Sequence, residues 1–146
     1  MHCAGARTVY YDDDPVRMKV AEQLGAEVHD VDGKREKDFH LAVDAGCNPE
    51  RLRKALLSVR PEGYVNSVGI YFDDVQLPLL ALYQRGVHFH NGKGHARPNM
   101  TPVLEAVAAG TLHPELVTGS LHAWEEIPDV LTSDRAGHKP LFVLDN

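Results

Sequence analysis

The sequence predicts an α/β fold in which helices cover both faces of a mostly parallel sheet. Short β-branched or aromatic runs alternate with helical segments of about ten residues, the order of elements typical of parallel sheets. Two of these runs lead into Asp14-Pro15 and Asn48-Pro49, where an N-cap residue precedes proline at the first helical position. The 146 residues are the size of one domain, so we expect residues 1–146 to form a single domain.

The expected elements follow one another along the whole chain. In the first half we expect a strand at 8–11, a helix at 16–24 stopped by Gly25, and a strand at 26–29. A charged loop at 30–38, a strand at 39–44 and a helix from 48 to about 59 follow. The apolar stripe of this last helix consists of Leu52, Ala55, Leu56 and Val59. In the second half we expect a turn at 61–63, a strand at 64–70, a short helix at 77–84 and a strand at 86–90. A helix at 102–109, a strand starting at 116–118, a helix at 124–131 and a strand at 140–144 complete the series.

Composition excludes several classes of protein. The formal net charge is −6 and no basic residues cluster, which argues against a nucleic-acid surface. No apolar run approaches the ~20 residues that span a bilayer, so we expect no membrane partner. Cys3 and Cys47 are too few for a disulfide framework or a four-cysteine zinc site, and we expect them to be reduced in the cytoplasm.

Taken in order, the local patterns resemble the cofactor-binding domain of zinc-type (medium-chain) alcohol dehydrogenases. No single pattern is specific, but the ordered series runs from about Ala4 to Leu144. It comprises the strand and helix at 8–26 that end in Leu-Gly-Ala, the strand and turn at 43–49, the proline-glycine segment and strand at 60–69, and the helix, strand and Trp-Glu start at 103–126. The resemblance implies a Rossmann-like sheet and hydride transfer between an alcohol and NAD.

The departures from the family pattern are equally informative. The family's first strand and its G-x-G-x-x-G turn belong just before Ala4, and this sequence does not contain them. It also has no Gly-His-Glu motif and no Cys/His ligand set for the catalytic zinc of the full-length family. We therefore expect the C-terminal portion of a cofactor-binding domain, inactive alone, with weak or vestigial NAD binding and possibly a missing N-terminal portion as partner.

Asp12 is the leading cofactor-binding candidate. In the family, an acidic residue at this strand end accepts hydrogen bonds from the adenosine ribose and disfavours the 2′-phosphate of NADP. Arg17, in the first turn of the next helix, corresponds to a basic residue that often touches the same ribose. The structural alternatives are a turn carboxylate beside a helix N-terminus and a solvated helix charge.

A second group of candidates lies where two strands end. Ala45 and Gly46 follow one strand, and Val68 and Gly69 close another. Ligands of open α/β sheets bind beyond the carboxyl ends of strands, so these residues are cofactor-binding candidates, although either glycine could simply serve a turn. The resemblance also assigns Lys139 to the cofactor pyrophosphate, on a local sequence that matches poorly.

The histidines raise two further possibilities. His88 and His90 alternate on the strand at 86–90 and share one face, and with His95 they could bind a metal. No cysteine or carboxylate joins them at a sharp spacing, and we assign no metal ligand. In the family this strand is the sheet edge that pairs with its copy, which implies a homodimer through Gly86–His90. A non-catalytic nucleotide-binding or assembly module and a histidine-based metal-binding module remain the alternative functions.

Overall fold

The computed structural model describes residues 5–94, 96–133 and 139–144. The chain divides into two compact units. The first, here called the terminal unit, combines residues 1–30 with 97–146, and the second, the middle unit, spans residues 31–96. Within these ranges all paired strands run parallel, in line with the mostly parallel sheet that the sequence predicts.

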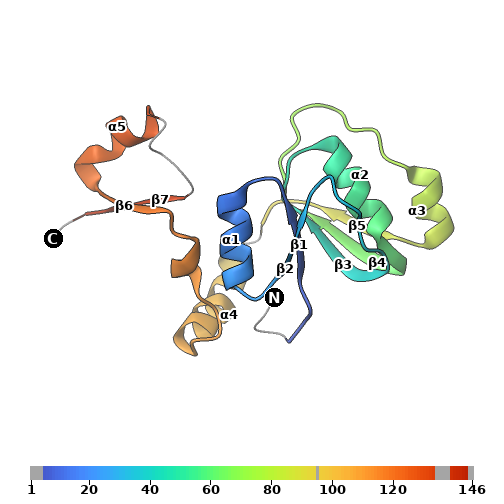
Figure 1. Cartoon of the computed structure of the whole chain (residues 1–146), viewed down its shortest axis with the longest axis horizontal. Helices are drawn as coiled ribbons and strands as arrows, with labels where there is room; N and C mark the ends of the chain where they lie inside the picture. Colours follow the sequence, from blue (N-terminus) through green and yellow to red (C-terminus); the bar gives the residue numbers. More distant parts are fainter. Residues whose placement is uncertain (1–4, 95, 134–138, 145–146) are drawn as a thin grey trace. The chain divides into compact units, whose positions relative to one another are not determined.

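The terminal unit opens with a strand–helix–strand motif made of β1 (Val9–Asp12), α1 (Pro15–Gln23) and β2 (Glu27–Asp30) (Figure 1). β1 and β2 pair in parallel from Val9 opposite Glu27 to Asp12 opposite Asp30. The expected cap is present, because the Asp14 carboxylate accepts hydrogen bonds from the backbone N–H groups of Val16 and Arg17. Gly25 ends the helix in the left-handed conformation, with φ 82°.

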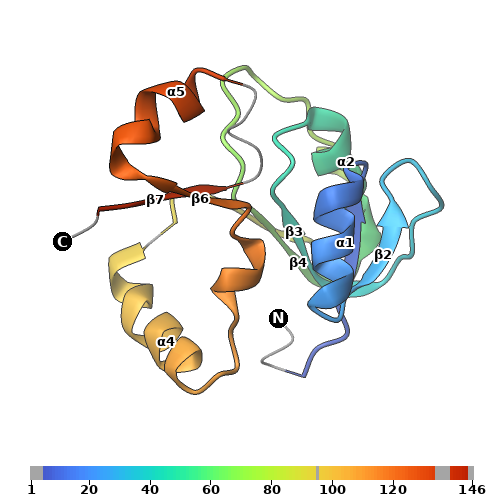
Figure 2. The same ribbon diagram turned by 60° about the vertical axis from the view of Figure 1, so that its left-hand side comes forward.

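The second half of the terminal unit contains a further parallel pair of strands. β6 (Ser120–Ala123) pairs with β7 (Pro140–Val143), as Figure 2 shows. The helix α4 (Ala96–Ala108) also belongs to the terminal unit, except for its first residue. The other helical elements of this unit are η2 (Pro114–Val117), η3 (Trp124–Glu126) and α5 (Ile127–Leu131).

The middle unit holds a three-stranded parallel sheet in the order β3-β4-β5. Its elements are β3 (Phe39–Asp44), α2 (Pro49–Ser58), β4 (Val59–Ser67), α3 (Leu79–Arg85) and β5 (His88–Asn91). The predicted apolar stripe of α2 forms the main core. That core consists of Leu52, Ala55, Leu56, Val59, Val65 and Leu82. Asn48 caps α2 as expected, with its side-chain oxygen 3.0 Å from Glu50 N and 3.1 Å from Arg51 N.

Three local predictions were wrong. Residues 61–63 form no separate turn, because β4 runs through them as an irregular strand in which Glu62 has φ 58°. Gly63 fits there since a Cβ would lie 2.8 Å from Val59 Cβ and 2.8 Å from Arg60 O. Residues 116–118 do not start a strand, because Pro114 at its first position favours the short 3₁₀ helix η2. α4 begins at Ala96 and carries Pro102 inside it.

The described strands form three separate ladders where the sequence predicts one sheet. β1 hydrogen-bonds to β2 alone, and β3 hydrogen-bonds to β4 alone, within the part of the chain that the structure covers.

Candidate functional site

Asp12 ends β1 and is held by groups from three directions. Its Oδ1 accepts hydrogen bonds from Asp13 N at 2.8 Å and Asp14 N at 3.1 Å, and Oδ2 accepts one from the Tyr10 hydroxyl at 2.5 Å. Arg17 adds a two-pronged contact, with Nε 2.8 Å from Oδ2 and Nη2 2.7 Å from Oδ1. The Asp12 side chain is about 10% exposed and is therefore largely shielded from water, whereas the Arg17 side chain is 45% exposed.

These contacts change the acid–base behaviour of the three side chains. The hydrogen bonds from Arg17 hold the pKa of Asp12 well below its usual range. In return, Asp12 raises the pKa of the Arg17 guanidinium. Burial, together with the hydrogen bond to Asp12, raises the pKa of Tyr10 to about 12. Asp12 is therefore a carboxylate, and Tyr10 a neutral phenol, throughout the physiological range.

The network limits what Asp12 can bind. A carboxylate offers about four lone-pair sites, and Asp12 already accepts five hydrogen bonds. A sugar hydroxyl could donate to Asp12 only after Arg17 or Tyr10 gives up its contact. The sequence singles out Asp12 and Arg17 as candidates, and the structure places them in direct contact. No role was predicted for Tyr10, although it lies two residues before Asp12 on the same face of β1.

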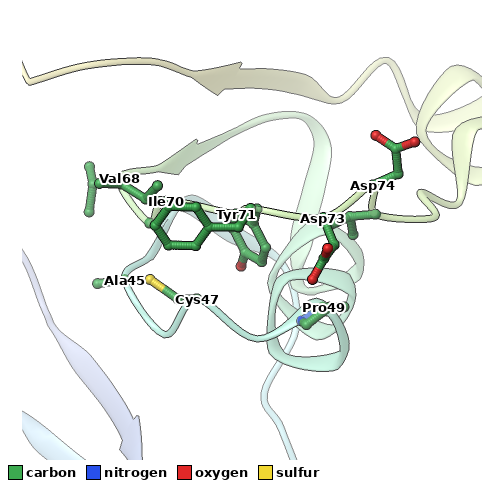
Figure 3. Close-up of a pocket in the computed structure, with 11 residues that line it drawn as sticks. Ala45, Cys47, Pro49, Val68, Ile70, Tyr71, Asp73 and Asp74 are labelled. Atoms are coloured by element: carbon green, nitrogen blue, oxygen red, sulfur yellow. The ribbon is translucent and has the colours of Figure 1, made fainter.

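The second group of candidates lines a pocket of about 540 Å³ in the middle unit. Figure 3 shows Ala45, Cys47 and Pro49 on one wall, and Val68, Ile70 and Tyr71 on the other. The first wall follows β3 and the second follows β4, so the pocket lies beyond the carboxyl ends of two neighbouring parallel strands. Such an edge of a parallel sheet is the usual location of ligand sites in α/β proteins.

Gly69 brings its backbone close to the opposite wall of the pocket. A Cβ at this position would lie 3.1 Å from Cys47 Sγ and 3.4 Å from Cys47 N, closer than the neighbours allow without moving. Cys47 itself has φ 49° and is exposed. Gly46 is not among the pocket-lining residues; its N–H donates to Asp44 Oδ1 at 3.2 Å and closes the turn after β3.

A buried carboxylate is hydrogen-bonded to Tyr71, one of the residues that line this pocket. Asp44, at the end of β3, is 5% exposed and accepts hydrogen bonds from Ser67 Oγ and the Tyr71 hydroxyl, both at 2.8 Å. Burial and the hydrogen bond to Asp44 raise the pKa of Tyr71. Sequence reasoning missed Ser67 and Tyr71 as partners of Asp44. The nearest signal is that Ser67 and Asp44 each end a predicted strand and so fall at the same edge of the sheet.

The structure brings the candidate residues together in two groups. Asp12 and Arg17 are in direct contact in the terminal unit, where Arg17 also lines a second hollow with Tyr10 and Lys139. Lys139 has φ 47° and is exposed. Ala45, Val68 and Gly69 share the pocket of the middle unit.

His88 and His90 lie on one face of β5, as the alternation predicts, and both are exposed. The His88 ring stacks on Tyr64 with centroids 4.5 Å apart, and its Nε2 lies 3.6 Å from Glu62 Oε2. Among the described residues, no group of three potential metal ligands includes either histidine. His95 lies outside the described residues.

The fold is shared with solved dehydrogenases. Alcohol dehydrogenase TADH from Thermus sp. ATN1 matches 96% of this chain with a TM-score of 0.85 at 23% identity. The chain has the Rossmann-type fold of alcohol dehydrogenases. An Escherichia coli CFT073 alcohol dehydrogenase complexed with NADH matches 96% of the chain (TM-score 0.80, 14% identity). A putative zinc-binding dehydrogenase from Sinorhizobium meliloti bound to NADP matches 97% (TM-score 0.80, 12% identity).

This chain spans less than half the length of those proteins, since it covers 44% of the first two and 45% of the third. No protein-family model and no curated protein matches the sequence. In the ranges that the structure describes, no helix is both long enough and apolar enough to cross a membrane.

Proposed function

We propose that the chain is the C-terminal part of the cofactor-binding domain of an NAD-dependent, zinc-type alcohol dehydrogenase of the cytoplasm. The parent reaction is hydride transfer between an alcohol carbon and the nicotinamide ring. The observation that carries the proposal is the pocket beyond β3 and β4, lined by Ala45, Val68 and Gly69, in a chain with a Rossmann-type fold.

In this proposal the nicotinamide end of the cofactor enters the pocket of the middle unit. Gly69 allows a flat ring to approach the backbone, because any side chain there would meet Cys47. The walls are mainly apolar, contributed by Val68, Ile70 and Tyr71 among others, which suits a ring that must be kept from water. The buried Asp44–Tyr71–Ser67 hydrogen bonds hold the two strand ends in register beneath it.

The adenosine ribose is assigned to Asp12. The carboxylate is ionised, as a hydroxyl acceptor must be, and its charge disfavours a 2′-phosphate. Because five donors already occupy Asp12, ribose binding requires an exchange in which Arg17 or Tyr10 moves aside. That exchange has an energetic cost and supports the expectation that cofactor binding by the isolated chain is weak. Lys139 is assigned to the pyrophosphate.

The zinc that polarises the alcohol oxygen in the full-length family has no ligand set in this sequence. There is no Gly-His-Glu motif, and the two cysteines, Cys3 and Cys47, are the only thiols. The 146-residue chain alone is expected to show no turnover of primary or secondary alcohols with NAD, and measurable turnover by the pure protein would contradict this.

Cofactor binding is tested by calorimetric titration with NAD of the unmodified chain and of Gly69→Val. We expect weak binding that Gly69→Val lowers by roughly tenfold or more, since a bulky group displaces well-packed neighbours. Gly94→Val is the matched control, because a Cβ at Gly94 meets nothing within 4 Å. Circular dichroism checks that both variants fold. Equal affinity of the two variants for NAD would reject the assignment of the pocket.

A further inference from the structure

Tyr71, which lines the pocket of the middle unit, is anchored at both ends of its side chain. Its backbone follows β4, and its hydroxyl donates a hydrogen bond of 2.8 Å to Asp44 Oδ2 at the end of β3. Asp44 is buried, so this bond is shielded from water. The side chain therefore crosses from the end of one strand to the end of its neighbour, in the middle of the residues that Figure 3 shows.

Packing fixes the orientation of the Tyr71 ring. The ring packs against the core cluster of the middle unit, and a Cβ at Gly69 would lie 3.4 Å from Tyr71 Cε2. Phe72 also lines the pocket, but its side chain is 94% exposed. A ring that is already held in place loses little further conformational freedom when a ligand packs on it. Tyr71 is therefore a preorganised aromatic surface in the pocket.

The electronic character of the Tyr71 ring favours a cationic ligand. The face of a tyrosine ring carries negative partial charge and attracts a cation placed over it. Burial and the hydrogen bond to Asp44 raise the pKa of Tyr71, so the side chain is a neutral phenol throughout the physiological range. Because its hydroxyl donates to a carboxylate, negative charge also lies beside the ring oxygen.

The charged side chains that line the pocket have the same sign. They are Asp73 and Asp74, and none of the lining residues is lysine, arginine or histidine. Both aspartates are exposed, so dissolved salt screens them, but what remains of their field attracts a positive charge. A cationic ring is therefore favoured in this pocket over a neutral ring of the same size.

The two forms of the nicotinamide ring differ in this property. The oxidised pyridinium ring is flat and positively charged, whereas the reduced dihydropyridine ring is neutral. We infer that Tyr71 is a specificity-determining residue that selects the oxidised cofactor, because its ring, held by Asp44, stacks on the pyridinium face. The inference rests on the proposed function and names the form of the cofactor that the pocket takes.

The test compares three ligands by calorimetric titration of the full 146-residue chain at one pH and one salt concentration. NAD and NADH differ in the charge of the nicotinamide ring, and ADP-ribose lacks that ring. We expect the unmodified chain to bind NAD roughly threefold more tightly than NADH, as cation–π attraction at a partly exposed site allows. Tyr71→Leu should abolish this preference and leave the affinity for ADP-ribose within about twofold of that of the unmodified chain.

Three further variants complete the experiment. Tyr71→Phe keeps the aromatic face and should retain part of the preference for NAD. Tyr71→Met is a second variant without a ring, and circular dichroism shows which variants fold. Tyr64→Leu is the matched control, since Tyr64 is 57% exposed on β4 and is not among the residues that line the pocket. It should retain the full preference.

The outcomes separate this inference from the proposed function. Equal or tighter binding of NADH by the unmodified chain would overturn the inference, and so would a preference for NAD that persists in Tyr71→Leu or Tyr71→Met. Equal losses for all three ligands in these variants would also overturn it, because they would show a purely structural role for Tyr71. If none of the three ligands bound the unmodified chain, the proposed function itself would fail, and the inference with it.

Discussion

At the scale of single residues, Asp12 joins β1 to the first turn of α1. One carboxylate accepts bonds from Tyr10, from Arg17 and from two backbone N–H groups. The structure shows Asp12 as a turn carboxylate beside the N-terminus of a helix. The ribose contact that we propose for Asp12 competes for the same oxygen atoms.

Substitution of Asp12 is expected to change the choice between the two nicotinamide cofactors. The unmodified chain should bind NAD more tightly than NADP, because the Asp12 charge opposes the 2′-phosphate. Asp12→Ala should abolish a preference of about tenfold, a factor equivalent to ~1.4 kcal/mol, and also frees Arg17 to meet a phosphate. Calorimetric titration with both cofactors measures this, and Asp13→Ala is a charge-matched control. Tighter NADP binding by the unmodified chain would show that Asp12 is misassigned.

Tyrosine ionisation provides a test of the hydrogen-bond network. The pKa of Tyr10 is raised to about 12 and that of Tyr71 is raised as well, each because of burial and a hydrogen bond to a carboxylate. In an alkaline titration followed by tyrosinate absorbance, two of the five tyrosines should ionise late. Tyr10→Phe should remove one late step and leave the other.

The raised pKa of Tyr10 also makes the unfolding free energy depend on pH in the alkaline range. A raised pKa in the folded chain means that the Tyr10 contribution is fully present below pH ~10, the value for unfolded tyrosine, and is lost as pH rises towards about 12. The unfolding free energy should therefore fall across this range less steeply in Tyr10→Phe than in the unmodified chain. If the unfolding free energy fell equally steeply with pH in both proteins, Tyr10 would not be hydrogen-bonded to Asp12 in solution.

At the scale of elements, the α2–β4 pair forms the core of the middle unit. Leu56 and Val59 are completely buried, and Val65 is 1% exposed. α2 ends and β4 begins without a loop between them, at Ser58 and Val59. The irregular stretch of β4 around Glu62 and Gly63 then re-aligns the strand, so that Leu41 to Asp44 pair with Tyr64 to Ser67. Burial of the helix stripe and the position of the pocket walls are linked through this one strand.

Truncation of Leu56 is expected to be strongly destabilising. Leu56→Ala should lower the free energy of unfolding by about 2–5 kcal/mol, since it removes apolar contact and leaves a cavity in the core. Leu80→Ala is the control, because Leu80 is 71% exposed on the neighbouring α3, and its effect should remain within about 0.5 kcal/mol. Urea denaturation of both variants makes the comparison. Similar losses in the two would contradict the position of the core.

At the scale of the whole molecule, the open edges of sheets are the main feature. β5 is the last strand of the β3-β4-β5 sheet, and no strand of the described ranges pairs with its outer edge. His88, Phe89 and His90 on this strand include neither proline nor lysine, the residues that usually prevent edge pairing. A twofold contact needs only one kind of chain. We propose that β5 pairs with its copy in a homodimer.

The oligomeric state tests that proposal. Light scattering at micromolar concentration and pH 7.5 should give twice the chain mass of 16.1 kDa. His90→Lys should shift the protein to the monomer, because lysine on an edge strand opposes pairing, and His113→Lys should not. A monomeric unmodified chain at pH 7.5 would reject the dimer.

What the sequence determined by itself was local. Asp14 and Asn48 predicted two helix starts, and alternating or continuous apolar runs predicted six of the seven described strands in outline. Caps and periodicity depend on neighbours within a few residues. Leu52, Ala55, Leu56 and Val59 were likewise identified as one buried stripe. Asp12 and Arg17, five residues apart, were predicted to face the same ligand, and the structure shows them in direct contact with each other.

The tertiary structure alone decided which distant segments are in contact. It also decided which conformation a segment adopts where its local preferences conflict. Ser67 and Tyr71 meet Asp44 across 23 and 27 residues, and no local pattern encodes such a pairing. The segment at 61–63 has turn-forming residues, yet pairing with β3 and the packing of Gly63 against Val59 make it part of a strand. Hydrophobic periodicity also does not predict that the strands form three ladders, because strand pairing depends on which edges meet in space. Local sequence selects the elements, and packing and hydrogen-bond completion select their partners.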